Sequence, residues 1–399
     1  MKTSRTWWIG GLVLLATGSL AVGQTEPSGI KDPGSTSPEA DADLTAAAKA
    51  YAQQAAQAAA ASAEGQKAFS EQRFHEAASL FARARQLRPG DFIATYNLAC
   101  SLSMAGERSE AAGRLLEAIE EGFCDRRALD RDPAIRVLLT EPGVAAVIEQ
   151  WPRVLTARRD ANVAQIESRY TKGYESSTDT GLRLAYRSAF DAVAFAEAQT
   201  ELSRLAKWAD RGVLKGVLDP AASELDPWVT VVLPNGNDFS RWAVAKFGLD
   251  AIEGVSGIGG SYDHDSRQLV AMDLGSTLRH EFFHVLHWRS MDRLGQRHPI
   301  WVMEGLCNLV EDYDLSNDGT LTPATSWRTN IAKRMEKGGG LTPLAAFLEM
   351  PQLKFTGSRP LANYAQARAL FLFLSDRGLL DRWYAEFTAG FDSEPTGRA

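Results

Sequence analysis

The chain has 399 residues, of which 45% are hydrophobic and 23% charged, so it can bury a substantial core and wholesale disorder is excluded. The formal net charge is −7 and no block of Lys or Arg occurs, so electrostatics give no reason to expect a nucleic-acid partner. The three cysteines are scattered and form no CxxC, which excludes a disulfide framework, a cysteine-built zinc site and a thioredoxin-like redox motif.

Residues 1–23 have the pattern of a signal peptide. Lys2 and Arg5 give a positive start, an apolar stretch follows at 7–20, and small residues stand at 21–23, where a signal peptidase would cut. The apolar stretch is shorter than the roughly twenty residues of a membrane span. An uncleaved N-terminal anchor is the alternative, and no later segment is expected to cross a membrane. The sequence therefore predicts an exported protein, periplasmic or extracellular.

The next two segments differ in composition. Residues 24–40 are rich in Pro and Gly and predict a flexible linker. Residues 41–63 predict a helix, because twelve of the eighteen residues at 46–63 are alanine, the best helix former.

Residues 64–155 contain a pattern that repeats every 34 positions. Small residues stand where two paired helices would cross closely, and large residues stand where a side chain would pack into the neighbouring helix. The segment therefore resembles tetratricopeptide repeats followed by a helical end-piece at 130–151. An unspecialised set of helical hairpins is the alternative. The matched positions are Gly65, Phe74, Ala77, Phe81, Ala84 and Pro89 in one unit and Ala99, Arg108, Ala111, Leu115, Ala118 and Phe123 in the next.

Residues 160–390 mix strand and helix patterns. Residues 181–190 and 228–234 read as strands, 191–214 and 239–249 as helices, and 254–273 as two strands around an Asp-rich turn. Helical patterns dominate afterwards. The fold class expected for the whole chain is α+β, with all-α repeats followed by a domain that has one small sheet.

Within this domain lies an HExxH motif formed by His280, Glu281 and His284. Residues four apart on a helix share one face, so both imidazoles can reach one metal ion. Glu281 is rotated by about 100° from His280 and can hold water at the metal. A catalytic zinc site needs a third protein ligand. Glu304, twenty residues past His284 on a second predicted helix, fits that role, whereas a further histidine in the HExxHxxGxxH spacing is absent.

HEFFH followed by WVMEGLCNLVE resembles the glutamate-zinc metallopeptidases, which include the thermolysin-like and aminopeptidase-N-like enzymes. The segment at 301–311 is similar to the W-L-x-E-G-x-A-x-Y-x-E of the aminopeptidase branch, and 257–273 is similar to the edge hairpin that precedes the zinc helix. The resemblance covers about residues 160–385 and implies Zn²⁺ as cofactor and a peptide or protein as substrate. It further implies that zinc activates a water molecule and that Glu281 is the general base.

Three positions depart from the family pattern. Asn308 stands where thermolysin-like enzymes have an aspartate that bonds the first zinc histidine, so it is expected to hold His280 without adding charge. Cys307 replaces the usual alanine and Leu309 the usual tyrosine. The GxMxN motif of aminopeptidases is also missing from the hairpin, which favours an endopeptidase.

Further candidates have more than one reading. His287 lies too far along the helix to join His280 on one metal and is expected to line the cleft, to support the metal ligands or to be solvated. Tyr364 is either the donor to the oxyanion that such enzymes place after the ligand glutamate, or a core tyrosine. Cys307 is expected to pack behind Glu304 as a small apolar residue, and zinc ligation is the less favoured alternative. The run at 263–265 is either a polar turn, which is favoured, or a second metal cluster.

The function predicted is a secreted or periplasmic zinc-dependent metallopeptidase that uses Glu281 as general base, with repeats that bind a protein partner. The alternative is a catalytically inactive scaffold of the same fold that works through its repeats. A pure repeat adaptor would not need the HExxH motif.

Overall fold

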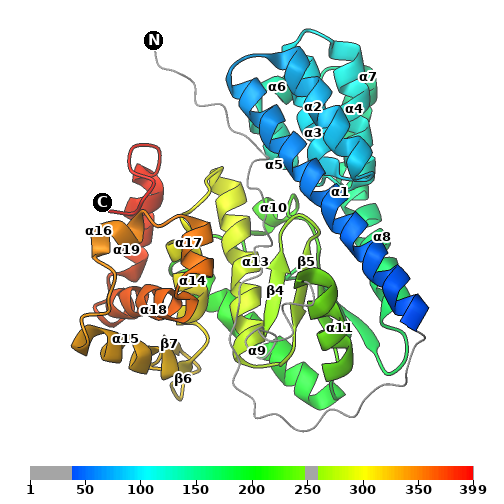
Figure 1. The fold of residues 1–399 in the computed structure, drawn as a ribbon. Coiled ribbons are helices and arrows are strands. Elements are labelled where there is room, and N and C mark those ends of the chain that lie inside the picture. The colour runs from blue at the N-terminus through cyan, green and yellow to red at the C-terminus, as the bar shows by residue number, and fades with distance from the viewer. Residues whose placement is uncertain (1–37, 248–258, 399) are drawn as a thin grey trace. The chain divides into compact units, whose positions relative to one another are not determined.

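The computed structural model describes residues 38–247 and 259–398 (Figure 1). These residues form two compact units, which divide between Arg158 and Arg159. The predicted signal peptide and all but the last three residues of the predicted linker lie outside the described ranges. No helix in the described parts of the chain has the length and apolar character needed to cross a membrane.

The N-terminal unit consists of helices joined by short turns. Successive helices pack against each other as antiparallel hairpins, first α1 with α2, then α3 with α4. The helices are α1 (Pro38–Ser70), α2 (Phe74–Leu87), α3 (Phe92–Met104), α4 (Arg108–Glu121), α5 (Arg126–Arg131), α6 (Pro133–Arg136) and α7 (Pro142–Glu149), and α8 (Trp151–Arg169) continues across the boundary into the second unit.

The repeated positions face the interior of this unit. Ala77, Phe81 and Ala84 of α2 are buried, and so are the residues 34 positions later in α4, at 111, 115 and 118. Gly65 allows α1 to approach α2 closely, because a Cβ there would lie 3.1 Å from the ring of Phe81. The helix expected at 41–63 is present. It continues without a break to residue 70 as part of the single helix α1, since no helix-breaking proline interrupts it.

The C-terminal unit is built on a five-stranded mixed sheet with strand order β1-β2-β3-β5-β4. Strands β2, β3 and β5 are parallel, and the edge strands β1 and β4 run antiparallel to their neighbours. The α+β class is therefore confirmed. Of the two strands expected at 254–273, residues 254–258 lie outside the described ranges, and the described part forms the antiparallel pair at 260–263 and 268–271. The strands are β1 (Glu175–Asp179), β2 (Leu184–Ser188), β3 (Val229–Leu233), β4 (Gly260–Asp263) and β5 (Gln268–Ala271).

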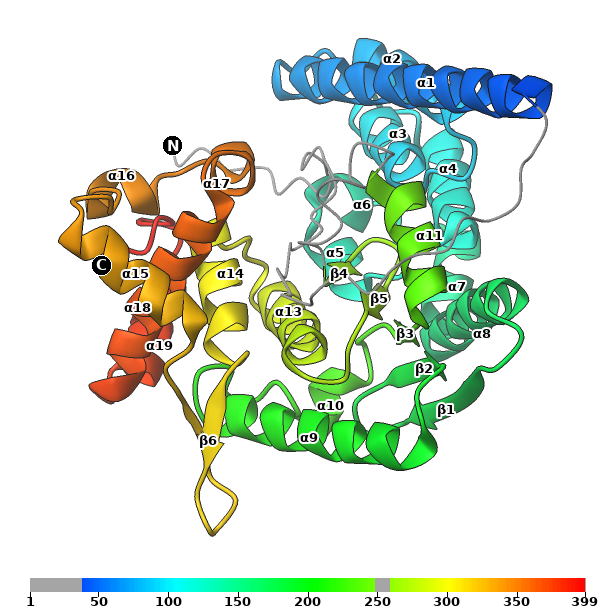
Figure 2. The ribbon, with the colours of Figure 1, turned by 60° about the horizontal axis from the view of Figure 1, so that its bottom comes forward.

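Helices cover both faces of this sheet, as Figure 2 shows. On one face, alternate strand residues such as Val231 and Leu269 pack against helices α9 and α13 in the larger core. On the other face, Val232 and Val270 pack against α11 and the end of α8. The helices of these layers are α9 (Ala192–Arg211), α10 (Pro220–Ser223), α11 (Gly236–Phe247) and α13 (Ser276–Leu294).

The rest of the unit is a group of helices around α18 and a small hairpin, β6-β7. Its elements are α14 (Ile300–Leu309), β6 (Tyr313–Leu315), β7 (Leu321–Pro323), α15 (Trp327–Lys337), α16 (Leu344–Leu348), α17 (Gln352–Gly357), α18 (Pro360–Asp376) and α19 (Leu380–Gly390). Helix α14 packs closely on α18 at Gly305, where a Cβ would lie 2.4 Å from Cδ2 of Phe371 and 3.3 Å from Cβ of Ala367.

Replacing Gly305 by Ala should therefore destabilise the C-terminal unit. The added methyl group overlaps the Phe371 ring, and overpacking of this kind lowers the free energy of unfolding by about 1–3 kcal/mol. Denaturant unfolding of Gly305→Ala measures the change. Gly357→Ala is the matched control, because a Cβ at Gly357 meets no atom within 4 Å. Equal stability of the two variants would contradict the close packing of α14 on α18.

Candidate metal centre

Helix α13 carries the HExxH motif and is fixed at both ends and along one face. Near its start, the carboxylate of Asp273 accepts hydrogen bonds from the backbone N–H of Gly275 (2.7 Å) and of Thr277 (3.3 Å). It ends at Gly295, which adopts the left-handed conformation (φ 69°) that favours glycine. Its apolar side chains, among them Phe282 and Leu286, are buried in the larger core. The remaining face presents the two histidines to helix α14.

Three candidate ligand atoms converge between α13 and α14. Nε2 of His280 and Nε2 of His284 lie 3.2 Å apart, and Oε2 of Glu304 lies 3.4 Å from the first and 3.6 Å from the second. A tetrahedral zinc ion with bonds of about 2.0–2.1 Å separates its nitrogen and oxygen ligands by about 3.3–3.4 Å. The three atoms therefore have the spacing of one face of a zinc tetrahedron, and the donor set of two imidazoles and a carboxylate suits zinc.

The charges around these atoms also suit a cation. Glu281 and Glu304 are both buried, and a buried carboxylate is stable in its charged form only with a positive partner. Burial opposes protonation of His280, but hydrogen bonds to Glu304 and Glu311 outweigh it and raise its pKa to about 10. Burial likewise opposes ionisation of Glu304, yet the charge of His284 and the hydrogen bond from His280 hold its pKa well below the usual range. A bound divalent cation would supply the positive charge that the histidines otherwise provide.

Glu281 lies beside this group and is held by the edge strand of the sheet. Its Oε2 accepts a hydrogen bond from the backbone N–H of Tyr262 at 2.7 Å, and its Oε1 is buried with no hydrogen-bond partner among the described residues. Strand β4 can come this close because residue 260 is glycine; a Cβ there would lie 2.6 Å from the carbonyl oxygen of Val270 and 3.0 Å from Cγ of Glu281. Burial raises the pKa of Glu281 to about 8. A carboxylate with this pKa and one open oxygen can accept and return a proton near neutral pH.

The residue that orients His280 is Glu311, so the role expected for Asn308 is wrong. Nδ1 of His280 donates to Oε1 of Glu311 at 3.0 Å. Both carboxylate oxygens of Glu311 also accept from Arg328, at 2.8 Å from Nε and 3.0 Å from Nη2. Asn308 is fully buried, and neither its oxygen nor its nitrogen has a hydrogen-bond partner within the described part of the chain. Helix α14 ends at Leu309, and the turn beyond it brings Glu311 back to the histidine.

Replacing Glu311 by Gln should lower zinc affinity by about 10- to 100-fold, the usual effect of losing a carboxylate that orients a histidine ligand. Competition with a chromophoric chelator measures the change. Asp226→Asn is the matched control, because Asp226 is a buried partner of Arg293 (2.6 Å) and bonds no candidate ligand in the described contacts. An equal loss of affinity in both variants would mean that a general loss of stability, and not the orientation of His280, is responsible.

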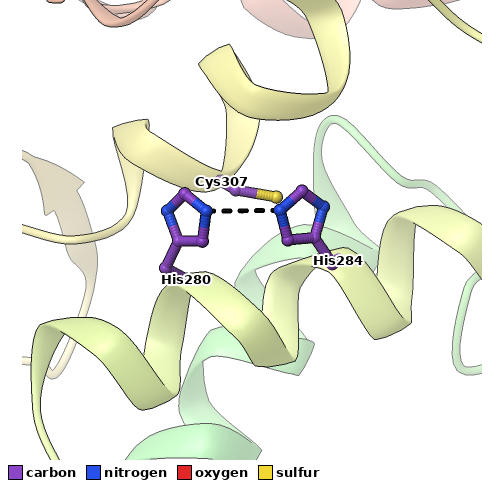
Figure 3. Close-up of side chains that lie close together, drawn as sticks. All are labelled: His280, His284 and Cys307. Carbon is purple, nitrogen blue, oxygen red and sulfur yellow. Dashed lines mark hydrogen bonds between the residues drawn. The ribbon is translucent and has the colours of Figure 1, made fainter. Parts of the chain in front are cut away.

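Cys307 is buried, as expected, but it also belongs to the candidate ligand group. Its Sγ and one ring nitrogen of each of His280 and His284 all lie within 4.8 Å of one another. Figure 3 shows the side chain extending from α14 toward the two rings, with the sulfur beside the ring of His284. The small number of cysteines excludes a zinc site built from cysteine alone, but it does not exclude one cysteine in a mixed site.

His287 is not solvated, and its described hydrogen bond and ring contacts are with residues other than the candidate ligands, so its expected role in supporting them stays a prediction. The ring is fully buried, and its Nε2 lies 2.8 Å from Nδ1 of His298. Both rings also contact Tyr384 of α19. Burial lowers the pKa of both histidines, that of His298 to about 3, so the pair is neutral. The cleft-lining and solvated readings are replaced by a buried pair that joins α13 to the C-terminal helices.

Tyr364, near the start of α18, is buried and packs against Arg328 and Phe355. Its ring centroid lies 5.5 Å from the guanidinium carbon of Arg328, which in turn holds Glu311. These contacts connect Tyr364 to the residues that position His280. Its role as a donor to the oxyanion stays a prediction.

The run at 263–265 has the contacts of a turn and not of a metal site. Asp263 accepts hydrogen bonds from the backbone N–H of Ser266 and from Nζ of Lys246, each at 3.1 Å. His264 points the other way, where its ring stacks on Trp288 and its Nε2 lies 3.3 Å from Asp292. The favoured reading of this run as a polar turn agrees with these contacts.

No protein-family model matches the chain, and no curated protein matches it significantly.

Proposed function

We propose that this chain is an exported zinc metallopeptidase, in which a zincin-like C-terminal unit hydrolyses peptide bonds. The observation that carries the proposal is the spacing of 3.2–3.6 Å between Nε2 of His280, Nε2 of His284 and Oε2 of Glu304. The buried carboxylate of Glu281 beside them supports catalysis as well as metal binding, because a site that only holds a metal does not need a second carboxylate that is not a ligand. The leader-like residues 1–23 support export.

The residues at the candidate zinc site would have separate roles in the reaction. His280, His284 and Glu304 would hold the zinc ion, which when bound lowers the pKa of water to about 7 and polarises the scissile carbonyl. Glu281 would take the proton of the attacking water on its open Oε1 and pass it to the leaving amine. The hydrogen bond from the backbone N–H of Tyr262 would hold the Glu281 carboxylate in one orientation while it gains and loses the proton. Glu311 and Arg328 would fix the ring of His280.

The N-terminal unit would bind a protein partner through tetratricopeptide-like repeats. Support comes from the buried residues at matching positions of α2 and α4 and from the close helix approach at Gly65. The partner could be the peptidase substrate itself or a protein that brings the enzyme to it. No nucleic-acid role is proposed, since the net charge is −7.

A second function, a zinc-holding scaffold without catalysis, is favoured by one feature. Cys307 offers a fourth protein ligand, and structural zinc sites are those in which protein fills all four positions. Such a protein would bind zinc and act only through its repeats.

A cleavage assay distinguishes the two functions. Purified protein, stripped of metal and then given one equivalent of zinc, is incubated with a broad peptide library, and mass spectrometry identifies the cut bonds. The peptidase proposal predicts zinc-dependent cuts. Most of them should be internal, because the GxMxN motif with which aminopeptidases hold a free N-terminus is missing from the sequence at 254–273. Zinc binding without any cut across the library would favour the scaffold.

The catalytic unit should also work without the repeats. Deleting residues 24–150 leaves α8 intact, and Ile166 of α8 and Tyr170, the residue after its end, belong to a core of the C-terminal unit. The truncated protein is expected to bind one zinc per chain and to cleave small peptides, and metal analysis with the library assay checks both. Loss of zinc from a folded truncated protein would show that the two units depend on each other.

A further inference from the structure

The position of Cys307 goes beyond the three-ligand site described above. It lies three residues after Glu304 on α14, and residues at this spacing share one face of a helix. Helix α14 therefore presents a carboxylate and a thiol together to the two histidines of α13. Sγ of Cys307 and the histidine nitrogens lie within 4.8 Å of one another (Figure 3).

This separation is close to that of ligands on one ion. Zinc bonds of about 2.0 Å to nitrogen and 2.3 Å to sulfur place the two atoms about 3.5 Å apart in a tetrahedron. Because the sulfur lies at most 4.8 Å from each histidine nitrogen, a shift of no more than about 1.3 Å brings it to the 3.5 Å expected for two ligands of one zinc ion. A change in the Cys307 side-chain torsion, or a small closure of α14 on α13 around the ion, provides a movement of this size.

We infer that Cys307 is the fourth protein ligand of the resting metal, and that its thiolate occupies the coordination position that the attacking water needs. This inference rests on the proposed peptidase function. With the thiolate on the metal, the enzyme is inactive, and it becomes active only when the thiolate leaves the metal. The thiol loses its proton to the buffer when the metal–sulfur bond forms, and it is protonated again when substrate or water replaces it. Thiolate also selects the metal, because sulfur favours zinc over magnesium, calcium or manganese.

Cobalt(II) reports the bond directly. A thiolate bound to cobalt gives an intense charge-transfer absorption in the near ultraviolet, which imidazole and carboxylate ligands do not give. The full-length protein loaded with one equivalent of cobalt should show this band. Cys307→Ala and the nearly isosteric Cys307→Ser should bind cobalt without it. Cys124→Ala, which removes a buried cysteine of the N-terminal unit, is the matched control and should keep it.

Two further readouts accompany the spectrum. Zinc affinity of Cys307→Ser, measured against a chelator, should fall by at least the roughly 10-fold expected from loss of even an outer-sphere partner. Turnover of a library-derived peptide by zinc-loaded Cys307→Ala should exceed that of the parent, because the water position is then open.

The outcomes separate this inference from the proposed function. Stoichiometric cobalt without the band, together with unchanged zinc affinity in Cys307→Ser, overturns the ligand role of Cys307 and leaves the peptidase proposal standing. A band with parent turnover equal to that of Cys307→Ala overturns the latency. A parent protein that binds neither metal overturns both proposals. The band in the parent needs no variant, so the test does not depend on the variants folding.

Discussion

Replacing Glu281 by Gln is expected to reduce peptide cleavage by about 10²- to 10⁴-fold, the usual contribution of a general base. Glutamine keeps the size of the side chain and can still accept the hydrogen bond from the backbone N–H of Tyr262, now 2.7 Å from Oε2. It cannot take a proton at the position of Oε1, which is the buried oxygen without a partner among the described residues. The substitution should therefore lower the rate of cleavage without lowering the stability of the folded protein.

Zinc content is the control for this variant and is measured on the same sample as the turnover. The carboxylate of Glu281 is not one of the three converging ligand atoms, so Glu281→Gln should keep one zinc per chain. Turnover equal to that of the parent would show that Glu281 is not the base. A low rate accompanied by lost zinc would instead assign Glu281 to metal binding.

Replacing Glu304 by Ala is expected to lower zinc affinity by at least about 100-fold, more than the loss of a group that only orients a ligand. Oε2 of Glu304 lies 3.4 Å and 3.6 Å from the two histidine nitrogens, and no other carboxylate oxygen is described so near to both. Cleavage should fall in proportion to the zinc lost. Chelator competition measures the affinity, and turnover is followed at each zinc concentration.

Zinc binding by Glu304→Ala is compared with zinc binding by Cys307→Ala, because α14 offers both side chains to the histidines. Glu304→Ala leaves the thiol of Cys307 on the same face of α14, three residues on. Full zinc occupancy in Glu304→Ala, combined with its loss in Cys307→Ala, would mean that α14 contributes the sulfur and not the carboxylate. Weak binding in Glu304→Ala is the result that makes Glu304 the third ligand.

The convergence of His280, His284 and Glu304 was predictable because it follows local rules. The four-residue spacing of His280 and His284 fixes them on one face of any helix, and Pro299 marks the start of the next helix, which carries Glu304. Glu311 was missed for a physical reason. It lies beyond the end of α14 at Leu309, where helical periodicity no longer says which way a side chain points. The signal that could have found it is its retained place in the 301–311 pattern.

Other features depend on contacts that no local pattern encodes. His287 pairs with His298 and Tyr384, and Arg328 reaches Glu311 from a separate helix, so their roles follow from tertiary packing. Strand β1 was not predicted because its residues ESSTD are polar and mostly exposed, and only pairing with β2 makes them a strand. Strand β3 was predicted because its residues VTVVL are the β-branched, mainly apolar run that is typical of a buried strand.

Peptide cleavage is expected to require one zinc ion held by His280, His284 and Glu304. To measure this, metal-stripped protein is titrated with zinc while the rate of cleavage of one library-derived peptide is recorded. We expect no cleavage without zinc and a rate that rises linearly to a plateau at one zinc per chain. Cleavage by the stripped protein, or no cleavage at full occupancy, would show that the protein is not a zinc peptidase of this kind.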